Sequence, residues 1–298
     1  MNDQMGQTVG TVATLSRFPV KSMQGERLST AELTESGLVG DRAYALVETE
    51  TGKVTSAKNP GLGTQLLGCR AAFVEAPGSG DELPAVRITL PDGTAVTSDG
   101  HDADATLSGF LGCEVTLQQA APDDFTIDQY HPDVEDLDPD GHRDTVTESK
   151  LGAAFFAQAG IPSPVAAGSF LDLFPVSVLT TSTLARLQAL RPESRFDERR
   201  FRMNVTVDTP ADGFVENEWT GRSLQIGDTV RLTVFLSDPR CVMTTLAQGD
   251  LPKDTEILRT LARNNRVDVG GGLYPCAGVY AVVEAAGNIR AGDQVSLA

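Results

Sequence analysis

The chain has few cysteines and few histidines, and neither residue type occurs at the spacing of a common metal or redox motif. The four cysteines are Cys69, Cys113, Cys241 and Cys276, and no two of them form a CxxC pair. This spacing excludes zinc ribbons, thioredoxin-like motifs and covalent haem attachment. The three histidines lie in the acidic, turn-like stretches DGHDAD, QYHPDV and DGHRDT. We therefore expect exposed histidines without a metal site, and thiols without a disulfide framework.

Long apolar runs are also missing. No stretch approaches the roughly 20 apolar residues that a membrane helix requires. The first residues, MNDQMGQTVG, have neither the basic region nor the apolar centre of a secretory signal. We therefore expect a cytoplasmic protein without a membrane partner.

Positive charge is scarce in this chain. The 298 residues include 24 Lys and Arg against 41 Asp and Glu, which gives a formal net charge of −17. Nucleic acid is not an expected partner, because its binding requires a basic face. An acidic surface favours solubility, and any local cluster of Lys and Arg then stands out as a candidate anion site.

The distribution of apolar residues predicts a β-rich first half. Short runs of Val, Ile, Thr and aromatic residues recur between residues 10 and 117, and the Pro-Asp-Gly turn in LPDGTAV predicts a hairpin. Residues 121–148 are crowded with Asp, Pro and Gly, as in a linker or a long surface loop. We place a barrel-like or curled-sheet domain at residues 1–120, an acidic linker at 121–148 and a second domain at 149–298.

The second half mixes strands with a few helices. Helices are predicted within ESKLGAAFFAQAG, TTSTLARLQALRP and KDTEILRTLARNN, each of which ends at Gly, Pro or Asn. Asp254 is the expected cap of the last helix. The stretches IGDTVRL and AGDQVSL are interpreted as two similar hairpin turns. The expected fold class is α+β and rich in strands.

Cys241 follows directly after a Pro and an Arg in the stretch PRCVMTTL, at the end of the strand-like run LTVFLSD. The thiolate is the reactive and metal-binding form of cysteine, and positive charge from Arg240 would lower the pKa of the thiol. The alternative is the role of a buried, small apolar residue. Cys69, Cys113 and Cys276 fit that alternative better, because they lie among apolar and glycine residues.

Two stretches in the first domain carry candidate anion ligands. FPVKSMQGERL places Lys21 and Ser22 at the tip of a strand-like run, where an ammonium, a hydroxyl and free backbone N–H groups suit a phosphate or another oxyanion. The Walker glycine pattern is missing, which excludes a P-loop. In GLVGDRAYALV, Arg42 follows the turn at Gly40 and Asp41. The alternatives are an exposed Lys-Ser pair and a turn salt bridge of Asp41.

A basic run occurs in the second domain, in RPESRFDERRFRMNVTV. It holds five arginines and leads into the strand-like NVTV: Arg191, Arg195, Arg199, Arg200 and Arg202. Arginine suits phosphates and planar heterocycles, and the amide of Asn204 can both donate to and accept from a ring edge. The alternative is a solvated basic turn that neutralises the acidic surface.

The motifs PVKS, GDR, FRMN and RCVMTT, in that order, resemble the MOSC family. The resemblance covers about residues 10–297 and extends to the ending GNIRAGDQV. It is strongest to the two-part members, in which a MOSC N-terminal β-barrel precedes a MOSC domain, as in the amidoxime-reducing components and their bacterial relatives. It implies two β-rich domains with a few helices, and a molybdenum cofactor, Mo-molybdopterin, in the cleft between them.

The resemblance also implies roles for individual residues. Cys241 is expected to be the catalytic residue and the protein thiolate ligand of molybdenum. Lys21 and Ser22 match residues that contact the pterin phosphate. Cofactor binding is expected from cations, hydroxyls and one amide: Lys21, Ser22, Arg42, Thr180, Thr181, Ser182, Arg202, Asn204, Arg240 and Thr244. In LTTSTL, where relatives carry serine, the choice among the three hydroxyl residues stays open.

The implied activity is that of a molybdenum-dependent oxidoreductase. It would reduce small N-hydroxylated or N-oxide substrates, with electrons from a separate electron-transfer protein or reductase, because the chain has neither a Rossmann fingerprint nor an iron–sulfur cysteine run. The alternative is a carrier of the molybdenum cofactor or of sulfur that performs no turnover. The family also bears a label for pyridoxal phosphate binding.

One segment departs from the family pattern. Relatives commonly read TTxDxxTG after the cysteine, whereas this chain reads TTLAQGDLPKD, with Asp250 displaced. If this segment borders the active site, the preferred substrate is expected to differ from that of the amidoxime reducers.

Overall fold

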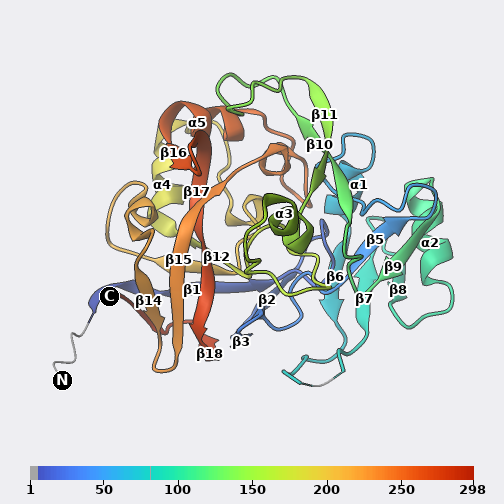
Figure 1. Ribbon diagram of the computed structural model, residues 1–298, viewed down its shortest axis with the longest axis horizontal. Coiled ribbons are helices and arrows are strands. Elements are labelled where there is room, and N and C mark those ends of the chain that lie inside the picture. Colours follow the sequence, from blue (N-terminus) through green and yellow to red (C-terminus); the bar gives the residue numbers. More distant parts are fainter. Residues whose placement is uncertain (1–5, 81) are drawn as a thin grey trace.

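The computed structural model describes residues 6–80 and 82–298 (Figure 1). The first part of the chain forms β1 (Gln7–Arg17), β2 (Glu26–Leu28), β3 (Thr30–Thr34), β4 (Gly37–Leu38), β5 (Ala45–Glu48), α1 (Gly63–Gly68), β6 (Arg70–Phe73), β7 (Val86–Thr89), β8 (Ala95–Thr97), α2 (Ala103–Leu111) and β9 (Val115–Gln118). The middle part forms β10 (Thr126–His131), β11 (Thr145–Lys150) and α3 (Gly152–Ala159).

The last part of the chain alternates strands with short helices. It forms β12 (Val176–Thr180), α4 (Thr181–Leu190), η1 (Glu198–Arg200), β13 (Val205–Asp208), η2 (Val215–Trp219), β14 (Ser223–Ile226), β15 (Val230–Pro239), η3 (Val242–Thr245), α5 (Glu256–Asn264), β16 (Arg266–Val269), β17 (Gly272–Ala285), β18 (Gly287–Arg290) and β19 (Gln294–Leu297). No helix among the described residues is long and apolar enough to cross a membrane.

A closed barrel of seven strands forms the largest unit. Its strands follow the order β12-β13-β1-β19-β14-β15-β17, and the pairing of β17 with β12 closes the circle (Figure 1). Inward-facing aliphatic residues of these strands, such as Val178, Val205 and Leu232, are fully buried and form one core. The strand-rich α+β class expected from the sequence is therefore confirmed.

The first strand belongs to the barrel of the C-terminal strands. β1 pairs with β13 on one side and with β19 on the other, so residues near both ends of the chain lie side by side (Figure 1). Sequence proximity could not reveal this pairing, because the partners lie almost 200 or more residues away. The division of the chain into domains at residues 120 and 149 stays a prediction. β1 belongs to the first of these segments in sequence but to the C-terminal barrel in space.

The remaining strands of the first part form small sheets around a second core. β3 pairs with β18, but its Ala31 and Leu33 belong to the barrel core. Around the second core, β6, β7 and β8 form one antiparallel sheet, and β5 pairs with β9. Leu46, Ile88 and Leu107 are fully buried in this core. The turn of LPDGTAV joins β7 to β8, which confirms the predicted hairpin. IGDTVRL likewise joins the paired strands β14 and β15, whereas AGDQVSL connects strands of different sheets.

Residues 121–148 include a strand pair. β10 and β11 form an antiparallel ladder from Thr126 opposite Lys150 to His131 opposite Thr145. Phe125 and Ile127 are buried in a core that includes Phe170, which anchors this acidic segment to the rest of the protein. A strand was not expected here because Asp, Pro and Gly dominate the composition.

The three predicted helices are present as α3, α4 and α5. Thr180 caps α4 by accepting a hydrogen bond from the Thr183 N–H at 3.2 Å. Thr255 is the N-cap residue of α5, one position after the expected Asp254. The Asp254 carboxylate nevertheless accepts a hydrogen bond from the Glu256 N–H at 2.9 Å, as a capping side chain does.

Candidate cofactor site

Three of the predicted cofactor residues have left-handed backbone conformations. Ser22, Arg42 and Arg202 have φ angles of 66°, 47° and 57°. Residues with a Cβ pay a conformational cost there, and such strain concentrates at functional sites. The three turns come from distant parts of the sequence and converge through the contacts that follow.

Asp41 is the centre of these contacts. Its side chain is 1% exposed and accepts hydrogen bonds from the Phe18 N–H at 2.8 Å and from Asn204 Nδ2 at 2.9 Å. It also forms an ion pair with Arg42. The predicted turn salt bridge of Asp41 is therefore present. The hydrogen bond from Asn204 joins this turn to the start of β13.

The guanidinium groups of Arg42 and Arg202 both lie over the ring of Phe18. Their central carbons are 4.5 and 4.4 Å from the ring centroid. Arg42 Nη2 also donates to the Arg202 carbonyl oxygen at 2.9 Å. Burial, together with the charge of Arg42, lowers the pKa of Arg202 to about 9. Two cations thus share one aromatic ring and one paired carboxylate, that of Asp41, which leaves a net positive charge suited to the binding of an anion.

Lys21 lies in a second cluster with Lys58 and Asp172. Lys21 Nζ donates to the Phe170 carbonyl oxygen at 2.9 Å and pairs with Asp172, and Lys58 Nζ donates to the other Asp172 oxygen at 2.8 Å. Burial alone would raise the pKa of Asp172, but the two ammonium groups outweigh it and hold that pKa well below its usual range. The cluster carries a net positive charge.

Cys241 is partly buried and lies at the start of η3. Its carbonyl oxygen accepts hydrogen bonds from the Thr244 N–H at 3.2 Å and from the Thr244 hydroxyl at 3.0 Å. Burial lowers the pKa values of Lys58 and Arg240, but Asp172 and Asp238 respectively raise them, and Cys241 adds a smaller effect in the same direction on both. The cysteine motif and the lysine cluster therefore meet in space.

Arg240 is fixed beside Cys241 by its own contacts. It forms an ion pair with the buried Asp238 and donates to the Phe201 carbonyl oxygen. Burial raises the pKa of Asp238 to about 6, although the charge of Arg240 opposes the rise. Arg240 Nε is buried and has no hydrogen-bond partner among the described residues. A donor of this kind inside a site is a place for a missing acceptor.

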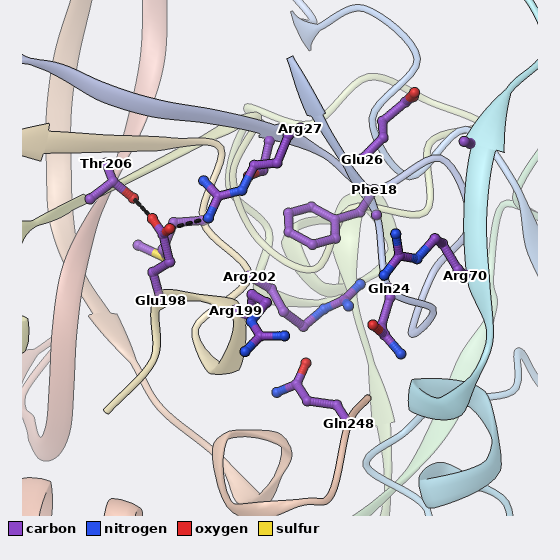
Figure 2. Close-up of a pocket in the computed structure, with 14 residues that line it drawn as sticks. Phe18, Gln24, Glu26, Arg27, Arg70, Glu198, Arg199, Arg202, Thr206 and Gln248 are labelled. Atoms are coloured by element: carbon purple, nitrogen blue, oxygen red, sulfur yellow. Dashed lines mark hydrogen bonds and ion pairs between the residues drawn. The ribbon is translucent and has the colours of Figure 1, made fainter. Parts of the chain in front are cut away.

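A pocket of about 320 Å³ opens beside Arg202 and Phe18. Figure 2 shows guanidinium groups from several elements around it, those of Arg27, Arg70, Arg199 and Arg202. Arg27 pairs with Glu198, whereas the Arg70 side chain has no ion pair within residues 6–80 and 82–298. The pocket is thus basic in a chain of net charge −17, as expected of an anion site.

The segment after Thr245 borders this pocket. Gln248 lines it (Figure 2), and the exposed Asp250 accepts from Arg195 at 2.8 Å and from Arg199 at 2.6 Å. Arg200 is buried below the segment and donates to the Pro252 carbonyl oxygen at 2.8 Å. Arg195, Arg199 and Arg200 of the basic run therefore hold this loop, whereas Arg199 and Arg202 line the pocket.

The three hydroxyl residues at the end of β12 lie apart from Arg202 and Asn204. They are Thr180, Thr181 and Ser182. β12 and β13 run parallel with Thr180 opposite Val207, whereas Asn204 bonds to Ser177 at the other end of the pair. The Thr180 hydroxyl donates to the buried Glu216 at 2.7 Å, and the Thr181 hydroxyl donates to Asp208 at 2.9 Å. The structure does not bring these hydroxyls to Arg202, because three residues of extended strand span about 10 Å.

Several donors in the cluster remain without a partner among the described residues. An ammonium has three N–H donors and a guanidinium five. Lys21 uses two of its donors. Arg42 donates from Nη1 and Nη2, and Arg202 donates from Nη1. The Ser22 Oγ accepts from the Ala57 N–H at 2.9 Å, which leaves its own hydrogen free. These groups fit an anionic cofactor beside a soft thiolate ligand.

The side-chain amide of Asn204, in contrast, has no donor or acceptor left for a cofactor. Its Oδ1 accepts from the Ser177 N–H and hydroxyl, both at 3.0 Å, and its Nδ2 donates to Asp41 and to the Ser16 carbonyl oxygen. The amide is thus saturated by protein groups. In this arrangement Asn204 positions Asp41, and through it Arg42, and has no donor left for a ring edge.

Lys58 and Asp172 were missed by the sequence interpretation. Lys58 lies in TSAKNP and Asp172 in FLDLFP, and neither stretch has a feature that distinguishes it from ordinary surface sequence. The two residues are 114 positions apart and become neighbours only through packing. The scarcity of lysine in this acidic chain was the one available signal, and it is weak.

Asp172→Asn is expected to lower the free energy of unfolding by about 2–3 kcal/mol at pH 7, because two largely buried ammonium groups lose their counter-charge. The folded pKa of Asp172 lies below the unfolded value of about 4. The stabilisation is therefore complete above pH ~4 and disappears as the pH falls towards the folded pKa. Urea unfolding between pH 3 and 7 measures this difference, with the exposed Asp123→Asn as control. A difference that grows on acidification would contradict the assignment.

Two family descriptions match this chain, one in each half. The description "MOSC N-terminal beta barrel domain" matches residues 9–124, and "MOSC domain" matches residues 167–296. The chain therefore belongs to the MOSC family, as a protein in which the N-terminal barrel domain precedes the MOSC domain. This confirms the resemblance carried by PVKS, GDR, FRMN and RCVMTT.

Within that family the chain is similar to the amidoxime-reducing components of mitochondria. It is 26% identical over 308 residues to mitochondrial amidoxime-reducing component 1 of Homo sapiens, which covers 98% of this chain and 84% of the relative. It is 27% identical over 307 residues to component 2 of Bos taurus, with 97% and 83% coverage. Among solved structures, the YUAD protein from Bacillus subtilis has a TM-score of 0.44 at 10% identity, and covers 97% of this chain and 95% of its own.

Proposed function

We propose that this protein is a molybdenum-cofactor-dependent oxidoreductase that reduces N-hydroxylated or N-oxide substrates. The observation that carries the proposal is the convergence, in a MOSC chain, of Cys241 with Lys58 and Arg240. Arg240 also contacts Met203, which lines the basic pocket. The names of the amidoxime-reducing relatives support the substrate class. Electrons would come from a separate electron-transfer protein or reductase.

The residues of the site would divide the work of holding the cofactor. Cys241 would supply the thiolate ligand of molybdenum, and the free donors of Lys21, Ser22, Arg42 and Arg202 would hold the pterin and its phosphate. Arg240 and Lys58 would place positive charge beside the Cys241 sulfur. When bound, the cofactor supplies two-electron redox chemistry at the metal.

Proton supply is the second task of the chain. Reduction of R–NHOH to R–NH₂ consumes two electrons and two protons and releases the oxygen as water. Lys21 is suited to hold one of these protons, because burial lowers the pKa of its ammonium against the opposing charge of Asp172. Asp238, with its pKa near 6, is a second group that exchanges protons close to neutral pH.

The test is purification from a host that makes the cofactor, followed by measurement of molybdenum and pterin per chain. We expect one of each, and turnover of benzamidoxime with an artificial electron donor. A chain that binds the cofactor and delivers it to an acceptor without reducing benzamidoxime would be a carrier and would contradict the proposal. A chain without molybdenum, alongside a loaded control enzyme from the same host, would contradict cofactor binding itself.

Asp250→Ala is expected to alter substrate affinity more than turnover. The change releases Arg195 and Arg199 and loosens the segment that contributes Gln248 to the pocket. We expect KM for benzamidoxime to rise several-fold with kcat nearly unchanged, and the melting temperature to stay close to wild type, because the ion pairs are exposed. Asp212→Ala, another exposed acidic residue, is the control. An equal fall in kcat would place the segment in the chemistry rather than at its border.

Two expectations from the sequence stay predictions. One is a cytoplasmic location, whereas the relatives named above are mitochondrial. The other is pyridoxal phosphate binding, which the molybdenum proposal does not require.

A further inference from the structure

Two histidines and an aspartate meet at the end of the β10–β11 hairpin. Their ligand atoms lie within 4.8 Å of one another. One oxygen of Asp138, Oδ2, is 3.1 Å from His131 Nδ1 and 2.8 Å from His142 Nδ1. His131 ends β10, and the other two residues lie in the loop that leads to β11. The expectation of exposed histidines is wrong for His131, which is 13% exposed, but holds for His142, which is 41% exposed, and for the exposed His101.

The outer contacts of the three side chains turn their inner atoms toward one another, where a metal ion would replace the contacts that these atoms now make. His131 Nε2 lies 2.9 Å from the Thr147 hydroxyl, so Nδ1 faces the centre of the cluster. Asp138 Oδ1 accepts from the Asp140 N–H at 2.9 Å, which turns Oδ2 inward. Metal-binding histidines and carboxylates in proteins are held by outer hydrogen bonds of this kind.

The donor set selects the class of metal ion. Two imidazole nitrogens and one carboxylate oxygen suit zinc and similar divalent transition metals, whereas Mg²⁺ and Ca²⁺ prefer oxygen ligands. Around tetrahedral zinc, ligand atoms are spaced roughly 3.4 Å apart. The two Nδ1–Oδ2 distances are slightly shorter than this spacing, as expected of hydrogen bonds. A small outward movement of the side chains would make room for the ion.

We propose that His131, Asp138 and His142 bind one zinc ion or a similar divalent transition metal ion, at a site separate from the molybdenum cofactor. The fourth position would be taken by water, because the His142 side chain is 41% exposed. The ion would close the loop of residues 132–141, in which Val134 and Leu137 are already buried against Leu258 and Ala262. It would thereby stabilise the hairpin without taking part in the proposed reduction.

The site borders the candidate cofactor site through the backbone. The N–H of Tyr130, next to His131, donates to the Lys58 carbonyl oxygen at 2.8 Å. A metal ion at the hairpin would thus hold the segment that carries Lys58. The inference rests on the three ligands alone and stands whether or not the molybdenum proposal is correct.

The experiment is a titration of the full chain, freed of metal by a chelator, with Zn²⁺ alone. Isothermal titration calorimetry is expected to give one site per chain with micromolar or tighter affinity. Co²⁺ in place of Zn²⁺ should give the visible absorption of a four-coordinate site. Repeating the titration with Cys241→Ala separates this site from the thiol, and the stoichiometry should not change.

His142→Ala is the decisive variant, because this partly exposed side chain is removed with little effect on folding. We expect it to weaken Zn²⁺ binding at least about tenfold and to remove the Co²⁺ spectrum. Thr147→Val should weaken binding about tenfold without removing a ligand. His101→Ala removes the one histidine outside the cluster and should bind like wild type. Wild type without stoichiometric Zn²⁺ binding, or His142→Ala with wild-type affinity, would overturn the proposal.

Discussion

Cys241→Ala is expected to lose molybdenum and to reduce benzamidoxime at least about a hundredfold more slowly than wild type. Loss of outer-shell partners alone costs metal sites about 10–100-fold in affinity or activity, and loss of a direct ligand should cost more. The fold should survive the change. Cys241 is partly exposed, and it is the carbonyl oxygen of Cys241, retained in alanine, that accepts both hydrogen bonds from Thr244.

The measurement is molybdenum per chain by elemental analysis, together with kcat/KM for benzamidoxime. Cys113→Ala is the matched control, because Cys113 is also partly exposed but lies in the turn between α2 and β9. It should keep both metal and activity. Equal molybdenum in Cys241→Ala and wild type would show that the ligand assignment is wrong, even if activity falls.

Asp41→Ala is expected to lower the free energy of unfolding by about 3–5 kcal/mol, as removal of one partner of a buried ion pair does. The change leaves the Phe18 N–H and the Asn204 amide without their acceptor, and Arg42 without its counter-charge. Each is a desolvated donor in the folded state. Since Asp41 also holds Arg42 against Phe18, cofactor content should fall together with stability.

Urea unfolding at pH 7 measures this loss, and Asp123→Ala, which removes an exposed carboxylate, is the control. Asp41→Asn tests the charge separately. It keeps one acceptor oxygen but presents an NH₂ group, and should fall between alanine and wild type. A loss below about 1 kcal/mol for alanine would mean that water replaces the carboxylate, and that Asp41 does not organise the site.

Local patterns predicted much of this protein correctly. The β-branched runs predicted the strands of the first half, and residues such as the glycine after α3 predicted the helix ends. These features depend on residues within a few positions of one another. The role of Cys241 was predicted from its neighbours and from the order of the motifs, and it stays a prediction.

Local patterns failed where the contact partner lies far away in the chain. The hydroxyls of Thr180, Thr181 and Ser182 were assigned to the cofactor, yet the register of β12 against β13 places them at the far end of the strand pair. The hydroxyl beside Asn204 is that of Ser177, which bonds to its amide instead. A shift of three residues along a strand is invisible in composition.

The sequence by itself determined the strand-rich class, the helix ends, the family and the cysteine on which the proposed chemistry depends. Only the tertiary structure decided that β1 lies between β13 and β19 in the barrel. It also decided that Lys58 and Asp172 join Lys21, and that His131 and His142 share one carboxylate. The reason is physical. Periodicity and turn chemistry act over a few residues. A buried charged cluster forms only where packing brings distant segments together and excludes water, so no short stretch of sequence predicts it.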